Sequence, residues 1–183
     1  MKQTFSYRVI RSARRTIAVQ ITPEGEVLVR CPNRMKAEDI QKFVNSKAEW
    51  ITTHLSAVAQ RPALPALTRE ELHALADRAL QYIPGRATHF APIIGVDYGR
   101  ITIRSQHTRW GSCSGKGNLN FNCLLMLTPP EVVDYVVVHE LCHRKEMNHS
   151  ARFWAEVERV LPDYKIRRKW LKDNGGALIA RLP

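Results

Sequence analysis

Hydrophobic and polar residues alternate in the first part of the chain, and a period of two predicts β-strands. The pattern is clearest at residues 16–21 and 26–30, which are separated by Thr-Pro-Glu-Gly. Proline and glycine between two alternating runs predict a β-hairpin. From Lys36 the spacing becomes helical, with one apolar face made of Ile40, Phe43, Val44, Ala48 and Ile51. Residues 1–60 are therefore expected to form a ββα unit.

A proline-containing stretch follows this unit and predicts a linker at residues 61–66. Two prolines in a short run disfavour a helix interior and favour an extended path. Thr68 and Glu71 then have the spacing of a capping box, which predicts a helix over residues 69–82. Ile-Pro-Gly at residues 83–85 is expected to stop that helix.

Two more alternating runs, at residues 99–105 and 118–126, predict strands. The glycine-containing segment 108–117 between them is expected to be a hairpin loop or bulge near a functional site. Thr128, with Glu131 three residues later, is expected to cap the next helix. This order of helix, strands and helix predicts an α+β fold, and by analogy a zincin-like one, with a small twisted sheet packed by helices.

The last third of the chain is predicted to be helical. Ser150 is expected to open one helix, which ends before Pro162 and has an inward face of Phe153, Trp154, Val157 and Val160. A final helix over residues 164–171 is rich in basic side chains, which form either a solvated face or a phosphate patch: Lys165, Arg167, Arg168, Lys169 and Lys172. The expected domains are residues 1–60 and 67–183, with one continuous domain as the alternative.

The strongest chemical signal is the sequence Val-Val-Val-His-Glu-Leu-Cys-His at residues 136–143. His139 and His143 are four residues apart, so both lie on one face of a helix and can bind one metal ion. Glu140 points about 100° away and is placed to accept a proton from a metal-bound water. The valines indicate a buried helix, in which polar groups need partners. The motif predicts one zinc ion per chain.

The third metal ligand is open between two candidates in the sequence. His149 lies six residues after His143, a distance over which the helix can end and the chain turn back. Asn148 suits such a turn because asparagine tolerates a positive φ. Glu156 or Glu158 in the following helix is the alternative, as in zinc enzymes with two histidines and a glutamate. His149 is favoured.

Composition restricts the class of protein. With 183 residues and 44% hydrophobic residues, the chain fits one domain or one domain with an appendage. It has no run of about 20 apolar residues and no N-terminal signal pattern, so a cytoplasmic protein without a membrane span is expected. The net charge of +11 is equally consistent with a nucleic-acid-binding surface and with a basic surface that has no such function. The scattered cysteines are expected to be reduced thiols: Cys31, Cys113, Cys123 and Cys142.

Several motifs together resemble the YgjP-like metallopeptidase family, with SprT-like and WLM proteases as more distant relatives. They are Arg-Trp-Gly-Ser-Cys-Ser at residues 109–114, Pro-Pro-Glu at 129–131, the segment 135–143, and Asn-His-Ser at 148–150 followed by Phe-Trp at 153–154. The resemblance implies a zincin-like fold. It also implies metal binding by the three histidines 139, 143 and 149, with the glutamate at 140 as general base.

The expected function is therefore a zinc-dependent hydrolase, most readily a metallopeptidase that cleaves polypeptides. The substrate is expected to pair with a sheet edge, either the strand at 118–127 or its neighbour. Arg109, Asn122 and Tyr135 are candidates for contacts to the substrate or the transition state. One alternative is a metal-dependent nucleotide pyrophosphatase acting on UTP, in which Arg109 and Lys116 hold phosphates. The other is a nucleic-acid-associated protease or binding module.

Overall fold

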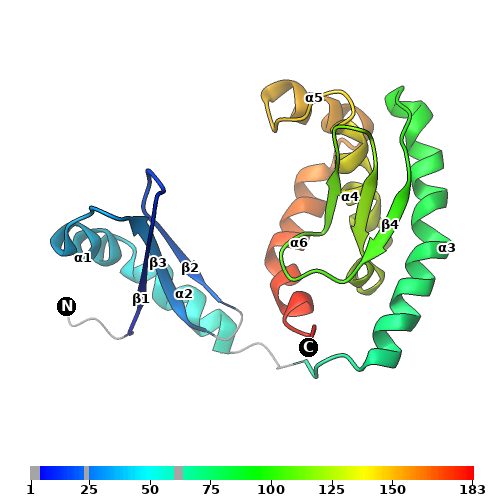
Figure 1. The fold of residues 1–183 in the computed structure, drawn as a ribbon. Coiled ribbons are helices and arrows are strands. Elements are labelled where there is room, and N and C mark those ends of the chain that lie inside the picture. The colour runs from blue at the N-terminus through cyan, green and yellow to red at the C-terminus, as the bar shows by residue number, and fades with distance from the viewer. Residues whose placement is uncertain (1–4, 23–24, 60–63) are drawn as a thin grey trace. The chain divides into compact units, whose positions relative to one another are not determined.

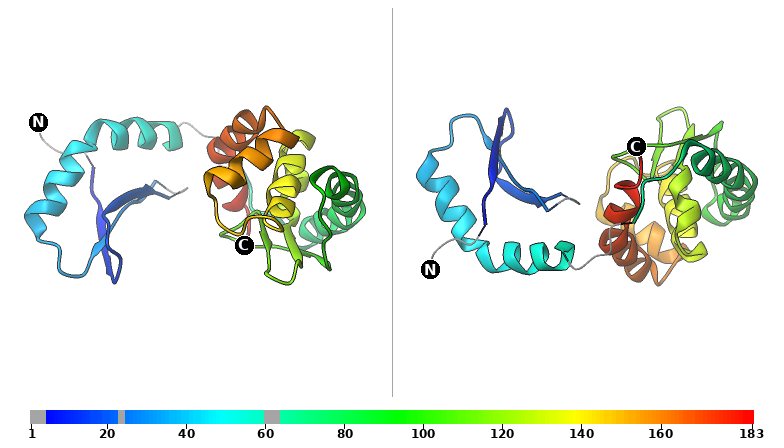
Figure 2. Two further views of the ribbon diagram at one scale, coloured as in Figure 1. Left: turned by 90° about the horizontal axis from the view of Figure 1, so that it is seen from above. Right: turned by 90° about the horizontal axis from the view of Figure 1, so that it is seen from below.

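The computed structural model describes residues 5–22, 25–59 and 64–183 (Figure 1). The chain divides into two compact units, Met1–Ala63 and Leu64–Pro183. Figure 2 shows the elements of each unit from two further sides. Residues 61–63 of the expected linker and residues 23–24 of the expected turn lie outside the described residues. No helix among the described residues is long and apolar enough to cross a membrane.

The first unit is a three-stranded sheet with two helices. Its elements are β1 (Arg8–Ser12), β2 (Ala18–Ile21), β3 (Val27–Pro32), α1 (Ala37–Ser46) and α2 (Ala48–Ala59). Strands β2 and β3 are antiparallel, as the hairpin prediction required, and Val19 lies opposite Val29. Strand β1 adds parallel to β3 on its other side. The predicted single helix is divided at Lys47 into two, whose buried residues Ile40, Val44 and Ile51 cover the sheet.

The second unit combines a small sheet with long helices, so the chain has a mixed α+β fold. Its elements are α3 (Arg69–Ile94), β4 (Ile101–Arg104), β5 (Gly111–Cys113), β6 (Leu119–Asn122), the 3₁₀ helix η1 (Cys123–Leu127), α4 (Pro130–Cys142), α5 (Ala151–Val160) and α6 (Tyr164–Ile179). The strand order is β4-β6-β5. Helix α4 contacts α3, α5, α6 and β5, so the metal-motif helix is packed on several sides.

The connection predicted as a loop at residues 108–117 contains a strand, which corrects the expectation. Strand β5 pairs antiparallel with β6, and β4 pairs parallel with β6. The hairpin is therefore formed by β5 and β6. The sequence did not predict β5, because a strand of three residues is too short to show alternation. The strand predicted over 118–126 stops at Asn122, whose side chain accepts a hydrogen bond from the Leu124 amide and starts η1.

Helix α3 is longer than predicted, because it continues through Pro84 and Pro92 instead of ending near residue 82. A proline has no amide hydrogen and so cannot donate to the carbonyl four residues earlier. The residues with these carbonyls, Leu80 and Thr88, are exposed. A helix-interior proline costs about 3 kcal/mol. Burial of the apolar stripe beyond residue 82 outweighs that cost, because each large apolar side chain that is buried stabilises the fold by about 1.5–3 kcal/mol. The stripe consists of Ile83, Ala87, Phe90, Ala91 and Ile94.

The capping predictions have mixed outcomes. The capping box of α3 is confirmed: Thr68 Oγ1 accepts from the Glu71 amide at 3.1 Å, and the Thr68 amide donates to Glu71 Oε2 at 2.8 Å. Thr128, however, does not cap α4. Its hydroxyl donates to the carbonyl of Leu125 at 2.8 Å, and Pro129 occupies the N-cap position instead.

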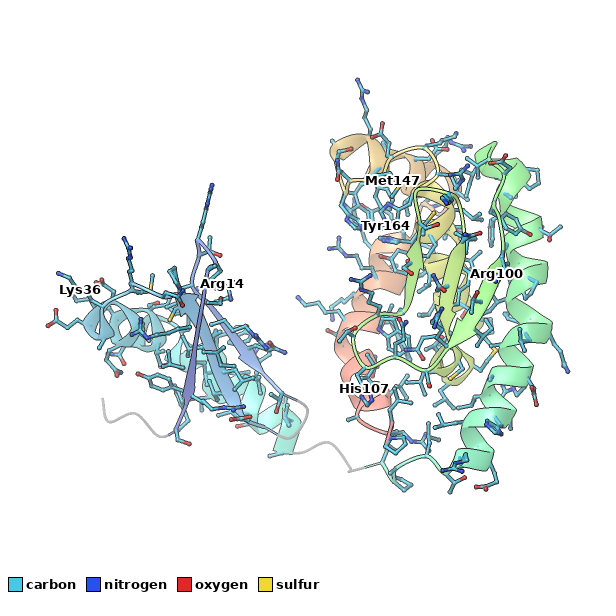
Figure 3. All side chains as sticks on the ribbon, in the orientation of Figure 1. Arg14, Lys36, Arg100, His107, Met147 and Tyr164 are labelled. Atoms are coloured by element: carbon cyan, nitrogen blue, oxygen red, sulfur yellow. The ribbon has the colours of Figure 1, made fainter. Side chains whose placement is uncertain are left out.

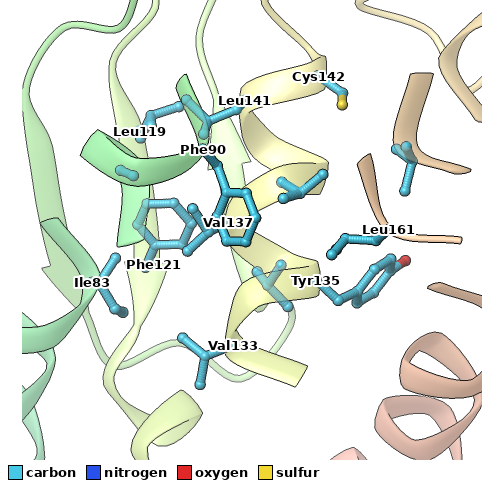
Figure 4. Packing of buried hydrophobic residues seen from close by; sticks show 14 of the residues in the cluster. Ile83, Phe90, Leu119, Phe121, Val133, Tyr135, Val137, Leu141, Cys142 and Leu161 are labelled. Carbon is cyan, nitrogen blue, oxygen red and sulfur yellow. The ribbon is translucent and has the colours of Figure 1, made fainter. Parts of the chain in front are cut away.

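Helix α4 is buried on most sides, as its valines predicted. Val132, Val133, Val136, Val137 and Val138 are at most 3% exposed. Figure 4 shows Val133 and Val137 among Ile83, Phe90 and Phe121, which come from α3 and β6, while Leu161 and Tyr135 lie on the opposite side of the helix. This packing holds the helix that carries the polar motif rigid, because displacing it would break apolar contacts on several neighbours.

Helix α6 passes through Gly175 and Gly176 and reaches Ile179, whereas the sequence predicted an end at residue 171. Gly175 is buried against Trp110: a Cβ atom at this position would lie 2.9 Å from Trp110 Cζ2. The glycine therefore lets the helix approach the ring closely, which offsets its low helix propensity. The start of α5 is as predicted, since Ser150 is its N-cap and accepts from the Phe153 amide at 3.3 Å.

Candidate metal centre

The structure brings together the three histidines proposed as ligands. Helix α4 carries His139 and ends at Cys142, and His143 is its C-cap residue. The chain then turns and returns His149 to the same point, where its Nε2 lies 3.0 Å from Nε2 of His139. The potential ligand atoms of the three rings all lie within 4.8 Å of one another. No described residue other than glycine has a positive φ, so Asn148 makes this turn without the predicted left-handed conformation.

These three side chains fit a zinc ion. Zinc–nitrogen distances of ~2.0–2.1 Å in a tetrahedron place the nitrogens about 3.3 Å apart, close to the 3.0 Å between His139 and His149. His143 Nδ1 lies 3.0 Å from the Glu146 carbonyl, which can only accept. This bond places the proton on Nδ1 and leaves the Nε2 lone pair for a metal.

Burial keeps the histidines of α4 neutral, which is the form that binds metal. Desolvation, reinforced by the charges of His143 and His149, lowers the pKa of His139 to about 3. Desolvation also lowers the pKa of His143, although the hydrogen bond to the Glu146 carbonyl opposes it. Burial thus favours the uncharged form of both imidazoles, in which one ring nitrogen of each has a free lone pair for an ion.

Aromatic rings from α4 and α5 hold the histidines in place. Phe153 stacks on His143 with ring centroids 4.5 Å apart, and Tyr135 meets His139 edge-on at 5.8 Å. Trp154 stacks on His149 at 5.7 Å. The buried Nδ1 of His139 has no hydrogen-bond partner among the described residues, so the surrounding aromatic rings, and not a bond at Nδ1, orient that side of the imidazole. Two of these aromatic residues come from the helix that Ser150 caps, which links the cap to the geometry of the site.

The glutamates considered as rival ligands have other partners. Glu156 bonds Arg159 at 2.6 Å and Lys145 at 2.8 Å. Hydrogen bonds from Arg159, and secondarily from Lys145, lower the pKa of Glu156 to about 2, against an opposing effect of burial. Glu158 pairs with Lys165 at 3.0 Å. Of the three candidates for the third ligand, the structure places His149 beside the pair.

Glu140 is next to the histidines but faces β5. Its side chain is 5% exposed, and burial raises the pKa of its carboxyl to about 8, although the positive charge of Arg109 acts in the opposite direction. Gly111, the first residue of β5, leaves the space that this carboxyl occupies. A Cβ atom at Gly111 would lie 2.7 Å from both Cγ and Oε1 of Glu140. The segment containing Gly111 is therefore a wall of the site.

The three expected substrate contacts have different environments. Arg109 is exposed and close enough to Glu140 to influence its pKa. Tyr135 is 5% exposed beside His139, and burial raises its pKa to about 12. Asn122 is 2% exposed, and its amide donates to the carbonyls of Gln106 and Arg109. Both donors of Asn122 are used, so this residue supports the loop before β5 instead of contacting a substrate.

The predicted phosphate patch on α6 is largely paired with acids. Lys165 bonds Glu158, Arg167 bonds Asp163, and Lys169 bonds Asp173. A face neutralised in this way is poorly suited to collecting phosphates. Arg168 is an exception: it has no carboxylate partner among the described residues and lies over the Trp154 ring at 4.4 Å.

The cysteines are free thiols, as expected: Cys31, Cys113, Cys123 and Cys142. Cys142, between the two histidines of α4, is fully buried in the apolar core. Burial raises the pKa of its thiol to about 12. Its role is packing, which agrees with the sequence prediction that its side chain points away from the metal.

Sequence reasoning missed three residues of the site. Gly111 makes room for Glu140, Trp110 packs on α6, and Arg168 lies on Trp154. A glycine directly after a tryptophan was a usable signal for close packing. The position of Arg168 had no signal, because it depends on how α6 docks against α5.

The second unit thus carries a three-histidine site with an adjacent buried carboxylate, which is the arrangement of metal-dependent hydrolases. Sequence comparison identifies the family. Residues 15–78 and 65–174 match the YgjP-like family, metallopeptidase domain, and the chain belongs to this family. Comparison with curated proteins gives no match.

Two solved structures are similar to about half of this chain. The metallopeptidase zymogen abylysin of Pyrococcus abyssi is 26% identical, with a TM-score of 0.45, over 49% of this chain and 92% of its own. The metallopeptidase zymogen jannalysin of Methanocaldococcus jannaschii is 18% identical, with a TM-score of 0.41, over 48% of this chain and 94% of its own.

Proposed function

We propose that the protein is a zinc-dependent metallopeptidase with a zincin-like domain formed by residues 67–183. His139, His143 and His149 would hold one zinc ion, and Glu140 would be the general base. The observation that carries the proposal is the meeting of three imidazoles, with ligand atoms within 4.8 Å, where one of the histidines is followed in the chain by a buried carboxyl. Structural zinc sites are usually closed and rich in cysteine, whereas three histidines leave a position for a water or substrate.

When bound, zinc supplies a Lewis acid that polarises water and a peptide carbonyl. Glu140 accepts the proton of the attacking water on its carboxylate and delivers it to the amine that leaves. Its buried position against Gly111 suits this task, because burial brings the pKa of the carboxyl near neutrality, where it both accepts and donates a proton. The positive charge of Arg109 favours the ionised form of this carboxyl.

The substrate is proposed to bind along β5. The expected alternative, the strand beginning at residue 118, corresponds to β6, which is the central strand and is hydrogen-bonded on both sides. It therefore has no free edge. Strand β5 is an edge strand of the described sheet and contacts α4. An extended peptide added to this edge would have its backbone amides and carbonyls paired, with a scissile bond beside Glu140.

The test uses the purified full-length chain and its Glu140→Gln variant. Metal analysis should find about one zinc per chain in both, and the wild type alone should cleave casein or unstructured peptides. The same pair incubated with UTP tests the pyrophosphatase alternative. Well-folded wild type that binds no zinc, or peptide cleavage that persists in Glu140→Gln, contradicts the proposal. Glu140-dependent UTP hydrolysis without peptide cleavage would establish the alternative instead.

A further inference from the structure

Arg168 lies over the ring of Trp154, which in turn stacks on His149 of the candidate metal centre. Tyr164 and Arg168 are one helical turn apart on α6, so both face the same neighbour. Tyr164 stacks on Trp154 at 5.4 Å with an interplanar angle of 15°, and the Arg168 guanidinium lies 4.4 Å from the centre of the same indole. Figure 3 labels Tyr164, which is buried at the start of α6.

Trp154 connects this arginine to the ligands. Its ring stacks on His149 at 5.7 Å and lies 5.8 Å from His139. Burial is the main cause of the low pKa of His139, and the charge of Arg168 acts in the same direction after those of the other two histidines. The guanidinium is thus one indole ring away from the metal ligands, on the side formed by α5 and α6.

The charge of Arg168 has no carboxylate partner in the described part of the chain, unlike the charges of three other basic residues of α6. Among the described residues, Lys165, Arg167 and Lys169 of the same helix each have a carboxylate partner, whereas Arg168 has none. A guanidinium that lies over an aromatic face keeps its N–H groups in its own plane, where they are available at its edge. This geometry matches a carboxylate, which accepts two parallel hydrogen bonds.

We propose that Arg168 is a specificity residue that binds a carboxylate of the peptide substrate, one or two residues from the scissile bond on the α5–α6 side. This inference rests on the proposed peptidase function. An extended chain advances about 3.3 Å per residue, so one or two residues span an indole ring. The carboxylate is either an Asp or Glu side chain or the free C-terminus of a short peptide.

The binding of peptides to the zinc-loaded Glu140→Gln protein tests the role of Arg168 without relying on turnover. Three fluorescent peptides of one sequence are compared by anisotropy. The first is neutral and amidated, the second has glutamate two residues after the scissile bond, and the third ends there with a free carboxylate. We expect one or both acidic peptides to bind more tightly than the neutral one, and Arg168→Gln to weaken only that binding by roughly tenfold or more. The preferred peptide identifies the source of the carboxylate.

The matched control is Arg100→Gln, which removes the same charge from an exposed arginine just before β4, labelled in Figure 3. It should change all three affinities equally and by less than about twofold. Arg168→Lys keeps the charge without the planar fork and should retain an intermediate preference. Two results overturn the proposal. One is that Arg168→Gln weakens the binding of neutral and acidic peptides equally. The other is that the Glu140→Gln parent protein binds acidic peptides no more tightly than neutral ones.

The outcomes separate this inference from the proposed function. Peptide cleavage by the wild type with no preference for acidic substrates refutes the role of Arg168 and leaves the peptidase intact. Arg168-dependent binding of acidic peptides without any cleavage by the wild type refutes the peptidase and leaves a carboxylate-binding site. A circular dichroism spectrum and zinc content equal to those of the parent show that Arg168→Gln is folded.

Discussion

Gly111→Ala is expected to abolish most of the proposed peptidase activity without loss of the proposed zinc. The added Cβ would lie 2.7 Å from Cγ and Oε1 of Glu140, whereas ordinary contacts are 3.4–4 Å. The carboxyl must therefore move by about 0.7 Å or more, beyond the roughly 0.5 Å tolerance of a catalytic group. A displacement near 1 Å costs about 10²-fold in rate, or roughly 2.7 kcal/mol in activation free energy. The three atoms nearest to this methyl group all belong to Glu140 and none to a histidine, so zinc should remain.

The assay is kcat/KM on an internally quenched unstructured peptide, together with zinc content and thermal unfolding. Gly115→Ala is the matched control, because a Cβ there has nothing within 4 Å. The control should keep wild-type activity. Gly111→Ala should approach Glu140→Gln in activity. If Gly111→Ala retains more than half of the wild-type kcat/KM, the glycine does not position the carboxyl. If it loses zinc instead, the structural reasoning about the separate roles of Glu140 and the histidines is wrong.

Three further outcomes are expected. His149→Ala should weaken zinc affinity by at least about tenfold, measured by chelator competition, whereas Glu158→Ala should not; the reverse result would make the glutamate the ligand. Asp134→Ala should lower the free energy of unfolding by about 1–3 kcal/mol in denaturant titrations. The substitution removes the acceptor of two partly buried hydrogen bonds that Arg86 of α3 donates at 2.6 and 2.9 Å. Hydrogen bonds from Arg159 lower the folded-state pKa of Glu156 to about 2. The ionised Glu156 therefore adds to the free energy of unfolding, by an amount on the order of 1 kcal/mol. This contribution is complete above pH 4.5 and disappears as pH falls towards 2. Glu156→Gln should flatten that part of the stability–pH curve, and an unchanged slope would exclude this ion pair as its source.

Local patterns predicted the elements whose signals are contained in a few neighbouring residues. The β2–β3 hairpin followed from alternation around a Pro/Gly turn, and the caps at Thr68 and Ser150 followed from side chains that bond amides three residues away. The valines of α4 indicated burial correctly. Where a signal competed with tertiary packing, it failed. Pro84 does not end α3, because the stripe beyond it is buried against α4.

Strand pairing was also beyond local information. Alternation shows which residues share a face, but it does not distinguish parallel from antiparallel partners or reveal a strand of three residues. The chain therefore appeared to have two strands joined by a loop, whereas β5 occupies that loop and forms the sheet edge beside α4. Asn122 had the chemistry of a substrate contact, yet burial commits its amide to two backbone carbonyls.

The sequence alone determined which side chains of this helix could form a metal centre, because helical periodicity places residues four apart on one face whatever surrounds them. It thus specified His139, His143 and the separate direction of Glu140. Only the tertiary structure brought His149, and not the glutamates of α5, beside the other two histidines, placed Gly111 against Glu140, and set Arg168 on Trp154. Those relationships join segments distant in the chain, and their distances depend on how helices and strands pack, which no local pattern encodes.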